Sequence, residues 1–151
     1  MSYQDYTKLI DIIGNTTRFL YLSCSYEPLM TPGFADYVAY AKSKGIPNIS
    51  FATNGILLTP KIVDDLVKNQ LTEIIISVNG FGEKNYNRIM EKANWNVLII
   101  NLQYLNDIKQ KNNTIYPKIR LNTILLKTNI ESLENLFHFI HEYNIDSVQF
   151  R

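Results

Sequence analysis

The chain has 151 residues, 46% of them hydrophobic, and a net charge of +1. This length suits one domain with a buried core, and the near-neutral charge argues against a protein that binds nucleic acid by neutralising phosphates. Because no apolar run approaches the ~20 residues that cross a bilayer and the first residues carry no secretory signal, we expect a cytoplasmic protein that binds neither nucleic acid nor membranes.

Helical and strand patterns alternate along the chain. Apolar residues at helical spacing, such as Tyr6 and Ile10, predict helices, and short apolar runs such as residues 19–22 predict strands. Thr128 with Glu131 three residues later fits a capping box at the start of the last helix. The expected helices cover about residues 6–13, 34–41, 60–67, 83–111 (interrupted near Asn94) and 128–140, and the expected strands cover 18–23, 49–52, 73–79, 118–126 and 147–151.

Strands that alternate with helices favour a parallel sheet with right-handed crossovers. Ile74, Ile75 and Ile76 form an uninterrupted apolar run, which suits a strand covered on both faces. A closed eight-stranded barrel needs ~250 residues. We therefore predict an α/β fold in which residues 1–151 form a single domain, a partial and open β/α barrel with parallel strands. Because the first expected element is a helix and the last is a strand, we also expect the chain to be a fragment.

Polar residues gather at the carboxyl ends of the expected strands, where parallel α/β proteins bind ligands. Ser77 and Asn79 are two residues apart and are expected to point to the same side of their strand. Mostly neutral side chains suit a zwitterionic, hydroxylated ligand such as a nucleoside or an amino acid, and no glycine-rich phosphate-binding motif occurs. An alternative stays open, because polar strand ends also meet solvent or cap the next helix. The candidate residues are Ser25, Tyr26, Glu27, Pro28, Thr53, Asn54, Ser77, Asn79, Asn122 and Arg151.

Three short motifs, in this order, resemble those of the radical S-adenosylmethionine (SAM) enzymes. Residues 25–28, Ser-Tyr-Glu-Pro, are similar to the Gly-Gly-Glu-Pro that follows the family's second strand. Residues 53–55, Thr-Asn-Gly, resemble the signature of its third strand, and residues 77–80, Ser-Val-Asn-Gly, are similar to its Ser-x-Asp-Gly. The resemblance runs from about Phe19 to Arg151 and implies the family's core fold.

The resemblance implies a role for each candidate residue in binding SAM. Ser25, Tyr26 and Glu27 would hold the ammonium of the methionine part through backbone carbonyls and the acidic side chain. Pro28 would fix the exit of that loop by locking φ. Contacts to the SAM carboxylate, the ribose or the substrate are expected from Thr53, Asn54, Ser77, Asn79, Asn122 and Arg151.

The sequence departs from the family's motifs at three positions. Ser25 and Tyr26 stand where the family has paired glycines, which permit unusual φ and a close approach of the backbone. We therefore expect a reshaped loop or weaker ligand binding. Asn79 replaces the commoner aspartate, which removes a charge from the mouth of the sheet.

The family binds a [4Fe–4S] cluster through three cysteines spaced C-x-x-x-C-x-x-C. Cys24 is the only cysteine of this chain and lies at the end of an expected strand, away from the family's cluster loop, so we expect it to be a buried structural thiol. His138 and His141 share a helix face without acids at matching spacing and are expected to face solvent. We therefore expect no metal ligand in this chain, with the cluster of the intact enzyme held elsewhere.

These observations predict the SAM-binding portion of a radical SAM enzyme. In the intact enzyme it would take part in reductive SAM cleavage and hydrogen abstraction, whereas the chain alone would be inactive. An alternative stays open, namely a non-catalytic α/β module derived from that fold, which binds a small molecule or a partner. In that case a homodimer would cover the open edges of the sheet.

Overall fold

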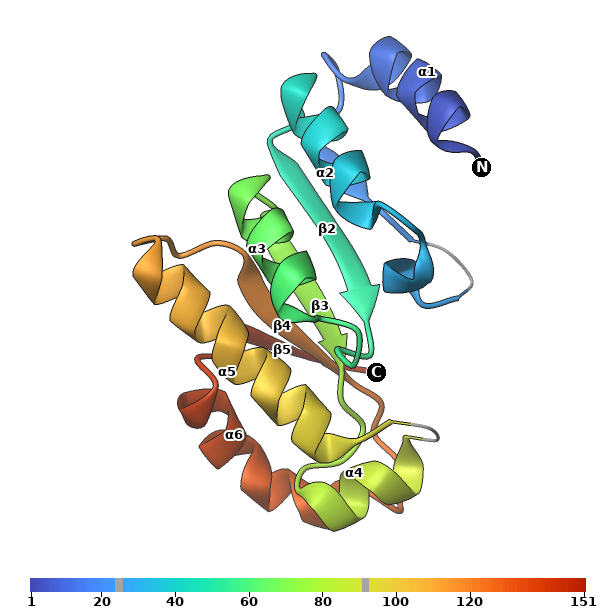
Figure 1. The fold of residues 1–151 in the computed structure, drawn as a ribbon. Helices are drawn as coiled ribbons and strands as arrows, with labels where there is room; N and C mark the ends of the chain where they lie inside the picture. The colour runs from blue at the N-terminus through green and yellow to red at the C-terminus, as the bar shows by residue number, and fades with distance from the viewer. Residues whose placement is uncertain (24–25, 91–92) are drawn as a thin grey trace.

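Five parallel strands form one open sheet in the computed structural model, which describes residues 1–23, 26–90 and 93–151. Neighbours in the sheet follow the order of the chain, and every pair is parallel (Figure 1), which confirms the predicted α/β fold. Cys24 and Ser25 lie outside the described residues, so the expectations about them stay predictions. The strands are β1 (Phe19–Tyr21), β2 (Asn48–Thr53), β3 (Glu73–Ser77), β4 (Lys118–Thr123) and β5 (Ser147–Phe150).

Helices cover one face of this sheet. Figure 1 shows three of them, α2, α3 and α5, on the same side of the strands, and each crossover between consecutive strands contains helical structure. The α-helices are α1 (Tyr3–Ile13), α2 (Phe34–Ser43), α3 (Pro60–Lys68), α4 (Glu83–Ile89), α5 (Trp95–Lys111) and α6 (Leu136–Glu142), and the 3-10 helices are η1 (Pro28–Met30) and η2 (Ile130–Asn135).

Side chains alternate between the covered face and the opposite face, which we call the open face. Ile49 and Phe51 of β2 are fully buried in the core beneath the helices. Ser77 and Asn122 are partners in the register of β3 and β4, and both are half-buried on the open face. Ile75 also belongs to the open face but is only 5% exposed. The apolar run is therefore buried on both faces of β3, as predicted, although the helices cover only one of these faces.

The long helical region is interrupted where the sequence predicts it. Helix α4 ends at Ile89 and α5 begins at Trp95, and Asn94 is the N-cap because its Oδ1 accepts a hydrogen bond from Val97 N at 3.2 Å. The two helices are joined further by Asn87, whose Oδ1 accepts a hydrogen bond from Trp95 N at 3.0 Å.

The capping box predicted at Thr128 is wrong. The chain instead enters η2 after its N-cap, Asn129, whose side chain makes no capping hydrogen bond to that 3-10 helix. The Asn129 side chain serves another purpose, since its Oδ1 accepts from Leu126 N and its Nδ2 donates to the carbonyl oxygens of Asn79 and Ile124. A buried amide that joins three backbone groups therefore replaces the expected hydroxyl cap and ties the ends of β3 and β4 together.

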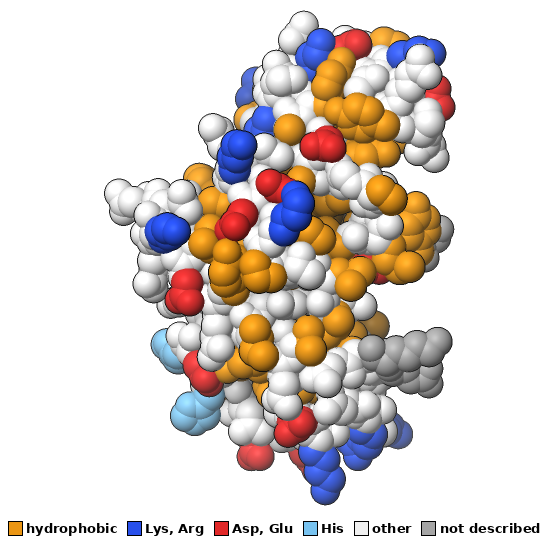
Figure 2. Space-filling view, in the orientation of Figure 1, with side chains coloured by type: hydrophobic (Ala, Val, Ile, Leu, Met, Phe, Trp, Pro, Cys, Tyr) orange, Lys and Arg blue, Asp and Glu red, His pale blue; other side chains and the backbone are white. Residues whose placement is uncertain are grey.

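Charged side chains of both signs are interspersed on the face shown in Figure 2, as the near-zero net charge suggests. His138 and His141 are both exposed on α6, which confirms the expected solvent-facing position. In the three described stretches, no helix combines the length and the apolarity required to cross a bilayer.

Candidate functional site

A hollow of about 340 Å³ lies at the carboxyl ends of β2 and β3. It brings together side chains that are as much as 51 positions apart in the sequence, as expected for the ends of neighbouring parallel strands. Six of the ten candidate residues line it, together with Ala52. These six are Tyr26, Glu27, Pro28, Thr53, Asn54 and Ser77.

Glu27 is the charged group of this hollow. Its Oε1 accepts hydrogen bonds from Thr53 Oγ1 at 2.7 Å and from Leu29 N at 3.3 Å, and its Oε2 accepts one from Asn54 N at 2.9 Å. Pro28 is the first residue of η1, and Glu27 is the N-cap of that helix. The carboxylate is thus fixed between the loop after β1 and the end of β2. A carboxylate offers about four acceptor positions, so one on Oε2 is left over when the donors within residues 1–23, 26–90 and 93–151 are counted.

Thr53 is 3% exposed, and its hydroxyl is committed to the protein. Besides donating to Glu27, the oxygen accepts a hydrogen bond from Gly55 N at 3.0 Å. Gly55 has a φ of +80°, and a Cβ at this position would lie 2.6 Å from Leu98 Cδ1. The Thr-Asn-Gly sequence therefore makes a tight turn that only glycine completes without strain. The main role of Thr53 at the hollow is to orient the Glu27 carboxylate by the hydrogen bond that it donates. A direct contact of Thr53 with SAM stays a prediction.

Asn54 continues the same turn. Its Oδ1 accepts a hydrogen bond from Ile56 N at 3.0 Å, which is the local side-chain turn typical of asparagine after a strand. Tyr86 Oη lies 3.5 Å from the Asn54 carbonyl oxygen. Burial raises the pKa of the Tyr86 phenol to about 12, so this side chain is a neutral packing group beneath the turn.

Ser77 and Asn122 continue the polar surface from the hollow onto the open face. The register pairs Ser77 with Asn122 and Asn122 with Gln149 of β5, so the three form one row across the sheet. Asn122 Oδ1 is buried and has no hydrogen-bond partner within the described part of the chain. Unpaired buried acceptors are rare, and this one is suited to a ligand that donates a hydroxyl or an N–H.

Asn79 and Arg151 do not line the hollow. Asn79 Oδ1 accepts a hydrogen bond from Ile124 N at 2.9 Å, and its Nδ2 donates to Met90 Sδ at 3.4 Å. An aspartate has no Nδ2 and could not donate to Met90. The asparagine at this position therefore stabilises the loop after β3. The backbone N of Arg151 donates to Thr123 O at 2.9 Å, which extends the pairing of β4 and β5. Binding roles for both side chains stay predictions.

Sequence reasoning missed the ion pair between Glu73 and Arg120 on the open face, in which Arg120 Nη2 lies 2.8 Å from Glu73 Oε2. Arg120 Nε is buried without a partner among the described residues. The signal was present in the sequence, since Arg120 lies two residues before Asn122 and therefore points to the same face. No group of three or more His, Cys, Asp or Glu side chains suited to a metal occurs within residues 1–23, 26–90 and 93–151.

The model of the radical SAM superfamily matches residues 3–140 of this chain. An uncharacterized protein of Methanocaldococcus jannaschii, MJ0103, is 28% identical over an alignment of 151 positions, which covers 97% of this chain and 33% of that protein. The chain therefore spans about a third of the length of this curated relative.

Two solved structures share the fold. Streptococcus suis SuiB bound to S-adenosylmethionine matches with a TM-score of 0.76 at 17% identity, over 97% of this chain and 32% of SuiB. The protein anSMEcpe with bound AdoMet and the Kp18Cys peptide matches with a TM-score of 0.71 at 13% identity, over 99% of this chain and 42% of that protein. At these identities the likeness concerns the fold alone.

Proposed function

Because the chain belongs to the radical SAM superfamily, we propose that it forms the SAM-binding portion of a larger radical SAM enzyme. The observation that carries this proposal is the Glu27 carboxylate. Three donors hold it at the carboxyl end of the sheet, and the described part of the chain leaves one of its acceptor positions unused. The SAM-bound fold neighbour supports the choice of ligand.

Glu27 would receive the ammonium of the methionine part of SAM. Glu27 is the one acidic residue among the described residues that line the hollow, and none of the others is basic, so its carboxylate would be the main attraction for a cation. The protein donors fix its position in advance, so little side-chain entropy would be lost on binding. Tyr26 lies at the same hollow, where the family has glycine, and its ring would narrow the entrance.

Ser77 and Asn122 would take the hydroxylated part of the ligand. Ser77 lines the hollow and is the register partner of Asn122. The Oδ1 of Asn122 is buried without a hydrogen-bond partner among the described residues. A ribose hydroxyl that donates to this oxygen would remove the cost of leaving a buried acceptor unpaired, which is about 1–3 kcal/mol.

The residues of this chain do not fit an iron–sulfur cluster, because three thiolates are required and the sequence contains one cysteine. In this proposal the cluster ligands come from outside the 151 residues, and the chain alone is inactive. Reductive cleavage of SAM and hydrogen abstraction from a substrate would belong to the intact enzyme. The expected cytoplasmic location and the homodimer over the sheet edges stay predictions.

Calorimetric titration of the full-length protein with SAM tests this proposal. Glu27→Gln preserves the shape but removes the charge, so we expect SAM affinity to fall at least tenfold, which corresponds to about 1.4 kcal/mol. Glu134→Gln, an exposed change on η2, is the matched control and should leave the affinity unchanged. Equal affinities of the wild type and Glu27→Gln would overturn the assignment of Glu27.

A further inference from the structure

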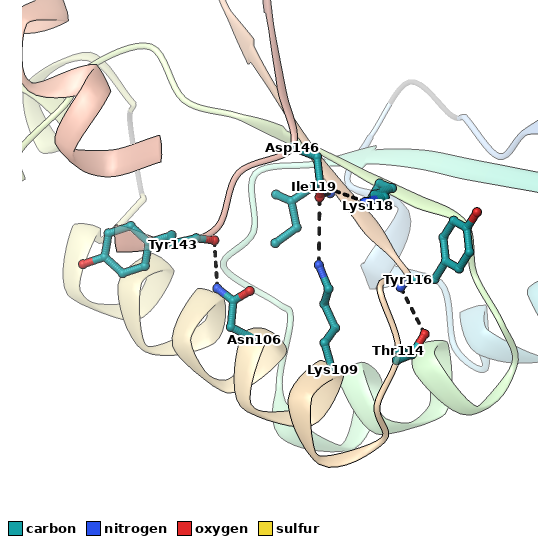
Figure 3. A network of polar contacts seen from close by, with 8 residues as sticks. All are labelled: Asn106, Lys109, Thr114, Tyr116, Lys118, Ile119, Tyr143 and Asp146. Atoms are coloured by element: carbon teal, nitrogen blue, oxygen red, sulfur yellow. Dashed lines mark hydrogen bonds and ion pairs between the residues drawn. The ribbon is translucent and has the colours of Figure 1, made fainter. Parts of the chain in front are cut away.

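A second polar cavity, of about 460 Å³, lies at the opposite end of the strands from the Glu27 hollow. It is formed by the last turns of α5, the first residue of β4 and the loop that precedes β5 (Figure 3). Side chains that line it include Asn106, Lys109, Gln110, Asn113, Lys118 and Asp146.

Asp146 is shared between two lysines. Its Oδ1 accepts a hydrogen bond from Lys118 Nζ at 2.7 Å, and its Oδ2 accepts one from Ile119 N at 2.8 Å. Lys109 Nζ lies 3.9 Å from Oδ2, which is too long for a hydrogen bond (Figure 3). Two ammonium groups and one carboxylate give the lining a net charge of +1.

The Lys109 ammonium is largely buried and has few polar partners. The residue is 9% exposed, and within the described stretches its ammonium donates no hydrogen bond. An ammonium has three donors, and burying a charge without full compensation is costly. Burial accordingly lowers the pKa of Lys109, although Asp146 opposes the effect. The side chain thus presents unused donors at the cavity.

The carbonyl groups at the end of α5 do not use the N–H donors of the Lys109 ammonium. The carbonyl oxygen of Lys109 accepts a hydrogen bond from Thr114 N, that of Gln110 accepts from Asn113 N, and that of Ile108 accepts from both nitrogens of Asn112. These backbone groups already satisfy the last turn of the helix. The Lys109 ammonium is therefore not required as a cap.

We propose that this cavity binds a small phosphate-bearing molecule whose phosphate lies between the ammonium groups of Lys109 and Lys118. Lysine acts as a point charge toward phosphate, and the phosphate oxygens would accept the donors that Asp146 leaves unused. Gln110 and Asn113, which also line the cavity, offer neutral amides to the rest of the ligand. The site lies at the other end of the strands from Glu27 and does not depend on SAM binding.

Lysine footprinting of the full-length protein tests this site, with inorganic phosphate as the probe. The protein is treated with a limiting amount of an acetylating reagent at constant ionic strength, with phosphate replacing chloride, and acetylation of each lysine is measured by mass spectrometry. We expect phosphate to slow acetylation of Lys109 and Lys118 at least fivefold. Lys61, whose side chain is 85% exposed, is the internal reference and should change less than twofold.

Two variants give opposite predictions. Lys109→Met removes one ammonium, so the protection of Lys118 should disappear. Asp146→Asn removes the competing carboxylate, so half-maximal protection should need several-fold less phosphate. The proposal would be overturned if phosphate did not protect Lys109 and Lys118 in the wild type, if it protected Lys61 equally, or if the protection of Lys118 were unchanged in Lys109→Met. SAM affinity, titrated with the same preparations, should not change in either variant.

Discussion

Thr53→Val perturbs the geometry of the Glu27 hollow without changing the size of the side chain. The substitution removes the donor to Glu27 Oε1 at 2.7 Å and the acceptor of Gly55 N at 3.0 Å. A hydrogen bond to a charged group contributes about 1.5–3 kcal/mol, and a buried N–H left unpaired costs about 1–3 kcal/mol. Part of this loss is recovered by relaxation, so we expect the free energy of unfolding to fall by about 3 kcal/mol.

Thr123→Val is the matched comparison for this experiment. Thr123 is fully buried at the corresponding end of β4, and its hydroxyl donates one neutral hydrogen bond to Val78 O at 2.8 Å. Its loss should cost about 1 kcal/mol. Urea denaturation monitored by circular dichroism measures both variants. If Thr53→Val is no less stable than Thr123→Val, the bridging role of the Thr53 hydroxyl is refuted.

Two further predictions concern the turn after β2. Gly55→Ala should lower the free energy of unfolding by about 1–2 kcal/mol more than Gly45→Ala does. Both glycines have positive φ, but only at Gly55 would the new Cβ meet a side chain, 2.6 Å from Leu98 Cδ1. Equal losses for the two variants in urea denaturation would contradict this packing. Burial raises the pKa of Tyr86 in the folded state to about 12. The phenol's contribution to the free energy of unfolding is therefore fully present below about pH 10, the pKa in the unfolded chain, and is lost as the pH rises through 12. Between pH 10 and 12 the wild type should therefore lose about 2 kcal/mol more stability than Tyr86→Phe, and parallel pH profiles would show that the phenol is not buried in solution.

The sequence predicts the sheet well because its signals are local. The apolar run at Ile74 to Ile76 and the helix break at Asn94 depend on residues within a few positions, and both are found where expected. The meeting of Glu27 with Thr53 also follows from topology, since the ends of adjacent parallel strands lie side by side.

The hydrogen-bond partners could not be predicted in the same way. Asn129 bonds to a carbonyl 50 residues earlier in the chain, whereas the capping-box pattern at Thr128 considers only the next turn. Lys109 and Asp146 are on separate elements, and nothing in either local sequence indicates that their side chains meet. Long-range side-chain contacts depend on packing, so periodicity and motifs do not determine them.

A crystal structure of the full-length protein with bound SAM would measure the distance between the methionine ammonium nitrogen and Glu27 Oε2. Our account predicts about 3 Å, the length of a charge-assisted hydrogen bond, with a ribose hydroxyl near Asn122 Oδ1. Bound SAM whose ammonium makes no contact with the Glu27 carboxylate would contradict the account.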